Sequence, residues 1–72
     1  SFKLYPNPSE GIVHIEFNES IHAYKIVDAL GREILKSDVT KPSETIEMDK
    51  KGIYFIQFEN GKSVTTKKFI IQ

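Results

Sequence analysis

The longest apolar run of the chain is Lys51-Gly52-Ile53-Tyr54-Phe55-Ile56-Gln57-Phe58-Glu59-Asn60-Gly61-Lys62. Five of the six residues from Ile53 to Phe58 are β-branched or aromatic, and these types favour a pleated, half-buried surface. We therefore expect a central strand here, with a sharp start at Gly52. Asn60 and Gly61 tolerate positive φ, so the chain should turn back into a second strand over residues 63–71.

Two registers are possible for this hairpin. A two-residue loop pairs Ile56 with Thr65. A type I turn followed by a bulge instead pairs Ile56 with Val64 and brings Ile70 to the same face. Because register decides which side chains reach the core, the hydrophobic pattern favours the bulged version.

Near its start the chain carries two prolines, Pro6 and Pro8, which exclude helix and fix an extended path. Leu4 and Tyr5 can form a short edge strand before them. Residues 7–11 then form a turn that leads rigidly into the next strand.

Four further segments are expected to form strands, two of them, residues 12–17 and 45–49, because polar and apolar residues alternate. They cover residues 12–17, 22–27, 32–37 and 45–49. The side chains expected in the core are Val13, Ile15, Phe17, Tyr24, Ile26, Ile46 and Met48. In the third segment the pattern leaves open whether Ile34 or Leu35 faces inward.

Polar connections separate these segments. Residues 18–20 and 28–31 are predicted turns, and in the second Asp28 can accept hydrogen bonds from the backbone ahead while Gly31 takes a left-handed conformation. Residues 38–44 lack periodicity and should form an exposed connection.

The strand count defines the fold class. No window of about 11 or more residues has helical spacing, and six or seven short strands with frequent turns predict an all-β fold, a small antiparallel Ig-like β-sandwich. Residues 1–72 form a single domain, and a domain this small buries only about 60% of its unfolded surface. Without cysteine it has no disulfide and no thiolate metal site.

Charge excludes some partners. Ten basic and ten acidic residues cancel, which argues against a nucleic-acid binder. Residues 1–48 carry a net charge of −3 and residues 49–72 a net charge of +3, and Lys67 and Lys68 are expected to protect an edge strand from pairing with other edges. No apolar run is long enough for a membrane-spanning helix.

Reactive chemistry has little support in the sequence. His14 and His22 fit no metal-ligand spacing and should be exposed, Asp49 lacks the neighbours of a calcium loop, and no serine lies in a nucleophile elbow. We expect no enzyme, no metal and no cofactor.

Four ordered motifs point to a known family. They are Leu4-Tyr5-Pro6-Asn7-Pro8 followed by Gly11, then Tyr24-Lys25-Ile26-Val27-Asp28-Ala29-Leu30-Gly31-Arg32, then Gly52-Ile53-Tyr54-Phe55-Ile56, then Lys67-Lys68-Phe69-Ile70-Ile71. The chain thus resembles the type A C-terminal sorting domain of the type IX (Por) secretion system of Bacteroidetes, over its whole length.

The resemblance implies a function in protein secretion. The chain would be the C-terminal part of a larger secreted protein, and would direct an N-terminal cargo domain across the periplasm and through the type IX outer-membrane translocon. A sortase-like signal peptidase would then remove it, leaving the cargo anchored at the cell surface or released.

The resemblance also implies jobs for particular residues. The junction near which cleavage occurs would be shaped by Tyr5, Pro6, Asn7, Pro8 and Gly11. The two hairpins would be held by Gly31, Gly52 and Tyr54. The terminal portion that the translocon reads, through addition of a strand, would consist of Lys67, Lys68, Phe69, Ile70 and Ile71.

Two alternatives make different demands on the structure. A carbohydrate-binding or fibronectin-like accessory module of a secreted enzyme requires a row of exposed aromatic side chains on a flat face. A domain that dimerises by edge pairing requires an open strand edge and a size in solution that depends on concentration.

Overall fold

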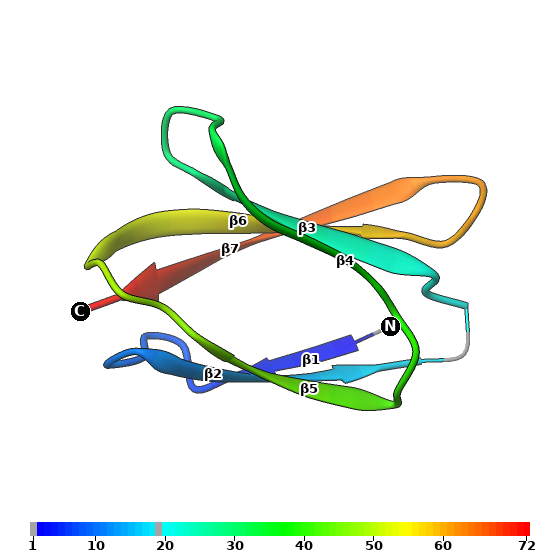
Figure 1. Cartoon of the computed structure of the whole chain (residues 1–72), viewed down its shortest axis with the longest axis horizontal. Coiled ribbons are helices and arrows are strands. Elements are labelled where there is room, and N and C mark those ends of the chain that lie inside the picture. Colours follow the sequence, from blue (N-terminus) through cyan, green and yellow to red (C-terminus); the bar gives the residue numbers. More distant parts are fainter. Residues whose placement is uncertain (1, 19) are drawn as a thin grey trace.

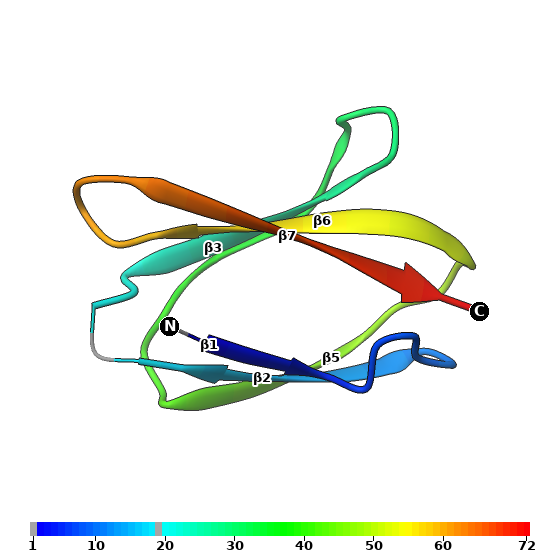
Figure 2. The same cartoon turned by 180° about the vertical axis from the view of Figure 1, so that it is seen from behind.

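A computed structural model describes residues 2–18 and 20–72, and in these residues it contains seven strands and no helix (Figure 1). The strands are β1 (Phe2–Tyr5), β2 (Ile12–Phe17), β3 (Ala23–Asp28), β4 (Glu33–Asp38), β5 (Ser43–Glu47), β6 (Gly52–Glu59) and β7 (Val64–Ile71). One sheet has the order β1-β2-β5 and the other the order β4-β3-β6-β7. The two sheets face each other, as Figure 2 shows from behind, so the expected antiparallel β-sandwich is confirmed.

The core fills the space between the two sheets. Six of the side chains expected there are buried, and Phe17 packs against them half-buried. The buried six are Val13, Ile15, Tyr24, Ile26, Ile46 and Met48. Alternation was therefore a reliable guide to the inward face of β2, β3 and the segment that contains β5.

The open choice between Ile34 and Leu35 is settled by a bulge. Ile26 pairs with Leu35, but the next residue, Val27, pairs with Glu33, so one residue of β4 is skipped. Leu35 packs against the core, whereas Ile34 is 50% exposed.

The turn after β3 has the predicted chemistry. Asp28 Oδ1 accepts hydrogen bonds from the N–H groups of Leu30 and Arg32, both at 2.9 Å. Gly31 has φ +84°, a conformation that side-chain-bearing residues rarely adopt.

Two other predicted connections need separate comment. The predicted turn at residues 18–20 includes Glu19, which lies outside the described residues. The connection predicted over residues 38–44 is shorter, because β4 extends to Asp38 and β5 begins at Ser43. Val39 within it packs against the core and is not fully exposed.

The central position of β6 is confirmed, since it pairs with β3 on one side and β7 on the other. Both registers considered for the β6–β7 hairpin are wrong, however. The observed pairs include Ile56 with Lys67 and Tyr54 with Phe69.

A loop of four residues, 60–63, explains the observed register. Asn60 Oδ1 accepts hydrogen bonds from the N–H groups of Lys62 at 3.0 Å and Ser63 at 2.8 Å. The N–H of Asn60 donates to the carbonyl oxygen of Ser63 at 3.2 Å. The asparagine side chain thus closes a longer loop than Asn-Gly alone suggests.

The register also reverses the expected face of β7. Phe69 and Ile71 are buried, with 1% and 3% exposure, while Ile70 lies on the opposite face and is half-buried. Relative to the favoured register, the shift is odd-numbered, and such a shift turns every side chain of a strand to the other face.

Candidate functional site

One edge of the larger sheet is formed by β7, and the loop after β1 lies along part of it. In both views this loop is at the same end of the molecule as the C-terminal end of β7 (Figures 1 and 2). Ser9 forms a parallel bridge with Ile71. Segments more than 60 residues apart in sequence therefore meet at one sheet edge.

Asn7 and Ser9 hold the loop to this edge, and we call these two residues and their bonds to residues 68–72 the edge latch. Asn7 Nδ2 donates to the carbonyl oxygen of Lys68 at 3.2 Å, and Asn7 Oδ1 accepts from the N–H of Ile70 at 3.1 Å. A side-chain amide has the same donor and acceptor as a peptide group. Asn7 therefore substitutes for a neighbouring strand.

Ser9 continues the edge latch with its backbone. Its N–H donates to the carbonyl oxygen of Ile70 at 2.9 Å, and its own carbonyl oxygen accepts from the N–H of Gln72 at 2.8 Å. These bonds complete a row of four between the loop and residues 68–72.

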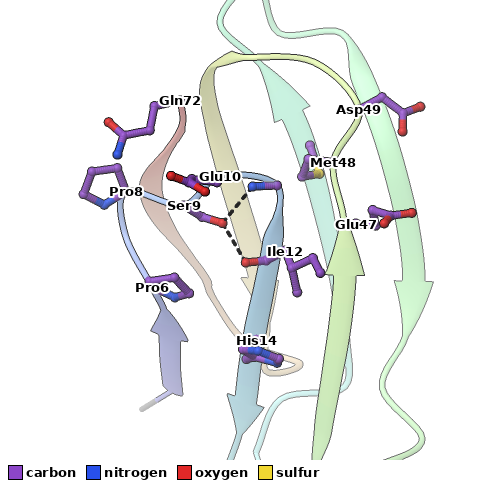
Figure 3. A pocket seen from close by; sticks show the side chains of 11 residues that line it. Pro6, Pro8, Ser9, Glu10, Ile12, His14, Glu47, Met48, Asp49 and Gln72 are labelled. Carbon is purple, nitrogen blue, oxygen red and sulfur yellow. Dashed lines mark hydrogen bonds between the residues drawn. The ribbon is translucent and has the colours of Figure 1, made fainter.

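The Ser9 side chain fixes the shape of the loop. It is 3% exposed, and its hydroxyl donates to the carbonyl oxygen of Ile12 at 2.6 Å and accepts from the N–H of Gly11 at 3.1 Å (Figure 3). Gly11 has φ +148°, and its carbonyl oxygen accepts from the N–H of Met48 at 2.8 Å. The loop is thereby tied to both sheets.

A shallow hollow lies beside the edge latch, between the loop and the chain that follows β5 (Figure 3). Its charged lining side chains are Glu10, Glu47 and Asp49, with His14 at one side. His14 is half-buried and not fully exposed, because its ring lies 5.5 Å from that of Tyr5 and its Nδ1 lies 3.1 Å from Thr45 Oγ1. Among the described residues no group of three or more metal-ligating side chains could hold an ion.

The structure brings most of the predicted site residues to this end of the β7 edge. Those in or beside the edge latch are Pro6, Asn7, Pro8, Gly11, Lys68, Ile70 and Ile71. Directly behind it, Tyr54 and Phe69 stack with ring centroids 5.6 Å apart, and Gly52 pairs with Ile71. Tyr54 is held by a 2.7 Å hydrogen bond from its hydroxyl to the carbonyl oxygen of Lys50.

Three predicted residues lie apart from the edge latch. Gly31 is in the β3–β4 turn. Lys67 is exposed on β7 before the latched part. The Tyr5 hydroxyl donates to Glu16 Oε2 at 2.7 Å, and this hydrogen bond raises the pKa of Tyr5.

Sequence reasoning missed Ser9. Its signal was local, because a serine two residues before a glycine can cap a turn through its hydroxyl. The contact of Asn7 with β7 had no comparable signal, because nothing in the local pattern relates residue 7 to residues 68–70.

The aromatic side chains do not form the exposed row that a carbohydrate-binding face requires. Tyr24, Tyr54, Phe58 and Phe69 are buried, and of the large hydrophobic side chains described as exposed the single aromatic is Tyr5, at 43%. The accessory-module alternative therefore lacks its distinguishing feature among the described residues.

Fold and site together define a small β-sandwich module whose opening loop is bonded to its last strand. The family model of the secretion system C-terminal sorting domain matches residues 3–72, and the chain belongs to this family. It is a sorting domain of type IX secretion, a system that delivers proteins to the cell surface or the extracellular space. Among curated proteins, none matches the chain significantly. Within the described residues no helix is long and apolar enough to cross a membrane.

Proposed function

We propose that this domain directs a cargo protein, joined on its N-terminal side, through the outer-membrane translocon of the type IX system. The observation that carries the proposal is the family match over residues 3–72. The cargo crosses the periplasm, and the translocon recognises the folded domain. The cargo then reaches the cell surface.

In the same proposal a sortase-like peptidase removes the domain at the surface, and the cargo is anchored or released. Cleavage occurs upstream of β1. This is supported by the position of β1 at a sheet edge, where it pairs only with β2. Proteolysis concentrates at exposed chain segments outside the packed strands.

The domain itself catalyses no reaction in this proposal. Ser9, the one polar residue described as buried, uses its hydroxyl to hold the loop. Because the hydroxyl is engaged in these two hydrogen bonds, the proposal assigns it no catalytic role.

Recognition is assigned to the β7 edge, with different contributions from its residues. Lys67 and Lys68 are exposed and can be read directly. Phe69 and Ile71 point into the core, so they contribute through the shape they maintain. Deleting residues 69–72 would remove two buried side chains and would disturb folding together with recognition.

The test is a fusion of this chain to a fluorescent reporter with an export signal, in a host that has type IX secretion. The informative variant replaces Lys67→Glu and Lys68→Glu together. The matched control replaces Lys50→Glu and Lys51→Glu, two exposed lysines of another segment, with the same change in net charge. Protease accessibility of the reporter on intact cells measures delivery.

We expect surface delivery of the wild-type fusion and of the control, and a loss of delivery for the Lys67/Lys68 variant. Retention of the wild-type fusion in the periplasm would contradict the proposed function. Equal delivery of both variants would show that Lys67 and Lys68 do not contribute to recognition.

A further inference from the structure

The edge of β7 is closed along only part of its length. In an antiparallel pair, alternate residues direct their backbone groups toward the partner strand and away from it. The edge latch occupies the outward groups of Ile70, the C=O of Lys68 and the N–H of Gln72. The same alternation turns the N–H and C=O of Val64 and Thr66, and the N–H of Lys68, toward the open side.

These outward groups form an open segment of edge, residues 64–68. All five residues are exposed, and the described residues provide no backbone partner on this side. Val64, Thr65 and Thr66 are β-branched and suit a strand. The open segment is thus a row of donors and acceptors already held in strand geometry.

Three lysines lie in or beside the open segment. Lys62 lies in the loop before β7, and Lys67 and Lys68 project from opposite faces of the strand. None of the three forms an ion pair with another described residue. The acidic residue of this hairpin is Glu59, which pairs with Val64 at the start of the open segment, and residues 60–72 contain no aspartate or glutamate.

This charge discriminates between possible occupants. A second β7 edge would bring three lysines against three, and such like-charge contacts are unfavourable. An extended segment with acidic side chains gains both the backbone bonds and the ion pairs. The lysines therefore reject a copy of their own strand and select an acidic one.

We propose that residues 64–68 bind an extended acidic segment of a partner protein by strand addition. The segment bonds to the backbone of Val64 and Thr66, and its carboxylates lie beside Lys67 and Lys68. The inference rests on the proposed function, in which the partner belongs to the export apparatus, and it specifies the chemistry by which that partner is bound.

The test uses the purified chain and two fluorescein-labelled peptides, one alternating valine with glutamate and the other alternating valine with lysine. Fluorescence anisotropy measures binding. We expect the glutamate peptide to bind, more weakly as salt is raised, and the lysine peptide to bind at least about tenfold more weakly, which corresponds to about 1.4 kcal/mol.

Thr66→Pro blocks the site selectively. The Thr66 N–H points away from β6, so proline removes a donor of the open segment and leaves the β6–β7 ladder intact. Thr66→Val is the matched control, because it keeps the N–H and the shape. We expect Thr66→Pro to lose glutamate-peptide binding and Thr66→Val to retain it, with thermal unfolding followed for both.

A second variant keeps the test decisive if proline disturbs the fold. Lys67→Glu with Lys68→Glu must reverse the preference between the two peptides. Equal binding of both peptides to the wild-type chain, or self-association of the chain in place of peptide binding, would overturn the inference. Because these measurements involve no secretion, they are separate from the reporter assay, in which periplasmic retention would overturn the proposed function.

Discussion

Asn7 joins the opening loop to the last strand through one side chain. Its amide donates to one backbone group of β7 and accepts from another, two residues further along. Asp, Ser and Thr cannot supply the same pair, because an ionised carboxylate only accepts and a hydroxyl is too short to span both groups. The asparagine of the Tyr-Pro-Asn-Pro motif is thus explained by its two hydrogen bonds to the β7 backbone. The two prolines restrict the path of the loop.

Asn7→Ala should loosen the edge latch while the rest of the sandwich stays folded. Each of the two lost hydrogen bonds is worth roughly 0.5–1.5 kcal/mol, so the free energy of unfolding should fall by about 1–3 kcal/mol. The direct measurement is hydrogen exchange of the Ile70 amide, which should become faster, with the core amide of Ile56 as the internal reference. Unchanged exchange at Ile70 would show that the Asn7 side chain does not hold β7 in solution.

Asp28 links stability to acid pH. Hydrogen bonds from the backbone N–H and the guanidinium of Arg32, with one from the Leu30 N–H, hold the pKa of Asp28 below its usual range. The unfolded chain, with an aspartate pKa near 3.9, therefore takes up the proton first. The stabilisation is complete above that value and is lost as pH falls through the lower pKa of the folded state.

Thermal unfolding measured as a function of pH should show this linkage on the acid side. Asp28→Asn keeps an oxygen acceptor for the backbone N–H groups but cannot titrate. We expect the variant to be less stable near neutral pH and to lose less stability than wild type as pH falls from about 5 to 2. Parallel profiles for the two proteins would mean that Asp28 does not contribute to the acid dependence.

At the level of elements, the strands were predictable and their exact pairing was not. Alternation identified Val13, Ile15, Tyr24 and Ile26 as inward because burial on one face imposes a period of two. The β6–β7 register depended on the Asn60 side chain, which closes a four-residue loop. Loop length changes the register without altering the strand pattern, so local sequence could not select it.

The β6–β7 register can be tested with a cross-strand disulfide. Gln57 and Thr66 are paired. The backbone groups of Ile70 point away from β6, and those of Thr66, four residues earlier, point the same way. The Gln57–Thr66 pair therefore has no mutual hydrogen bonds. Such pairs have Cα atoms about 4.5 Å apart, within reach of a disulfide. Gln57→Cys with Thr66→Cys should oxidise readily.

The matched control for this disulfide is Gln57→Cys with Val64→Cys, the pair that the two-residue loop would require. In the observed register these residues are diagonal neighbours, roughly 7–8 Å apart, and should remain thiols under the same conditions. Mass spectrometry with thiol alkylation counts the free thiols. Preferential oxidation of the control pair would contradict the four-residue loop.

For the molecule as a whole, the last strand is part of the core. The small sheet packs against Phe69 and Ile71 as well as against β3 and β6. The edge latch that covers β7 could not be predicted, because it joins residues more than 60 positions apart. Family motifs placed both segments among the site residues without indicating that they touch.

Phe69→Ala should therefore destabilise the entire sandwich. Its ring is 1% exposed and stacks on Tyr54, and truncation of a buried phenylalanine costs about 3–5 kcal/mol. Small domains are stable by only about 5–15 kcal/mol in total, so the loss is a large part of the whole. Urea unfolding measures it.

The control for this variant is Ile70→Ala, on the half-buried outer face of the same strand. It should cost clearly less than Phe69→Ala. The reverse order would mean that β7 presents its other face to the core, as in the bulged register.

Because Phe69 and Ile71 complete the core from the seventh strand, no fragment made of the first six strands has a full interior. A chain truncated before β7 is therefore expected not to form the stable sandwich. A prematurely terminated product would then display no folded tag, and under the proposed function it would be left behind. Under the proposed function, recognition of the folded domain would therefore depend on the presence of β7.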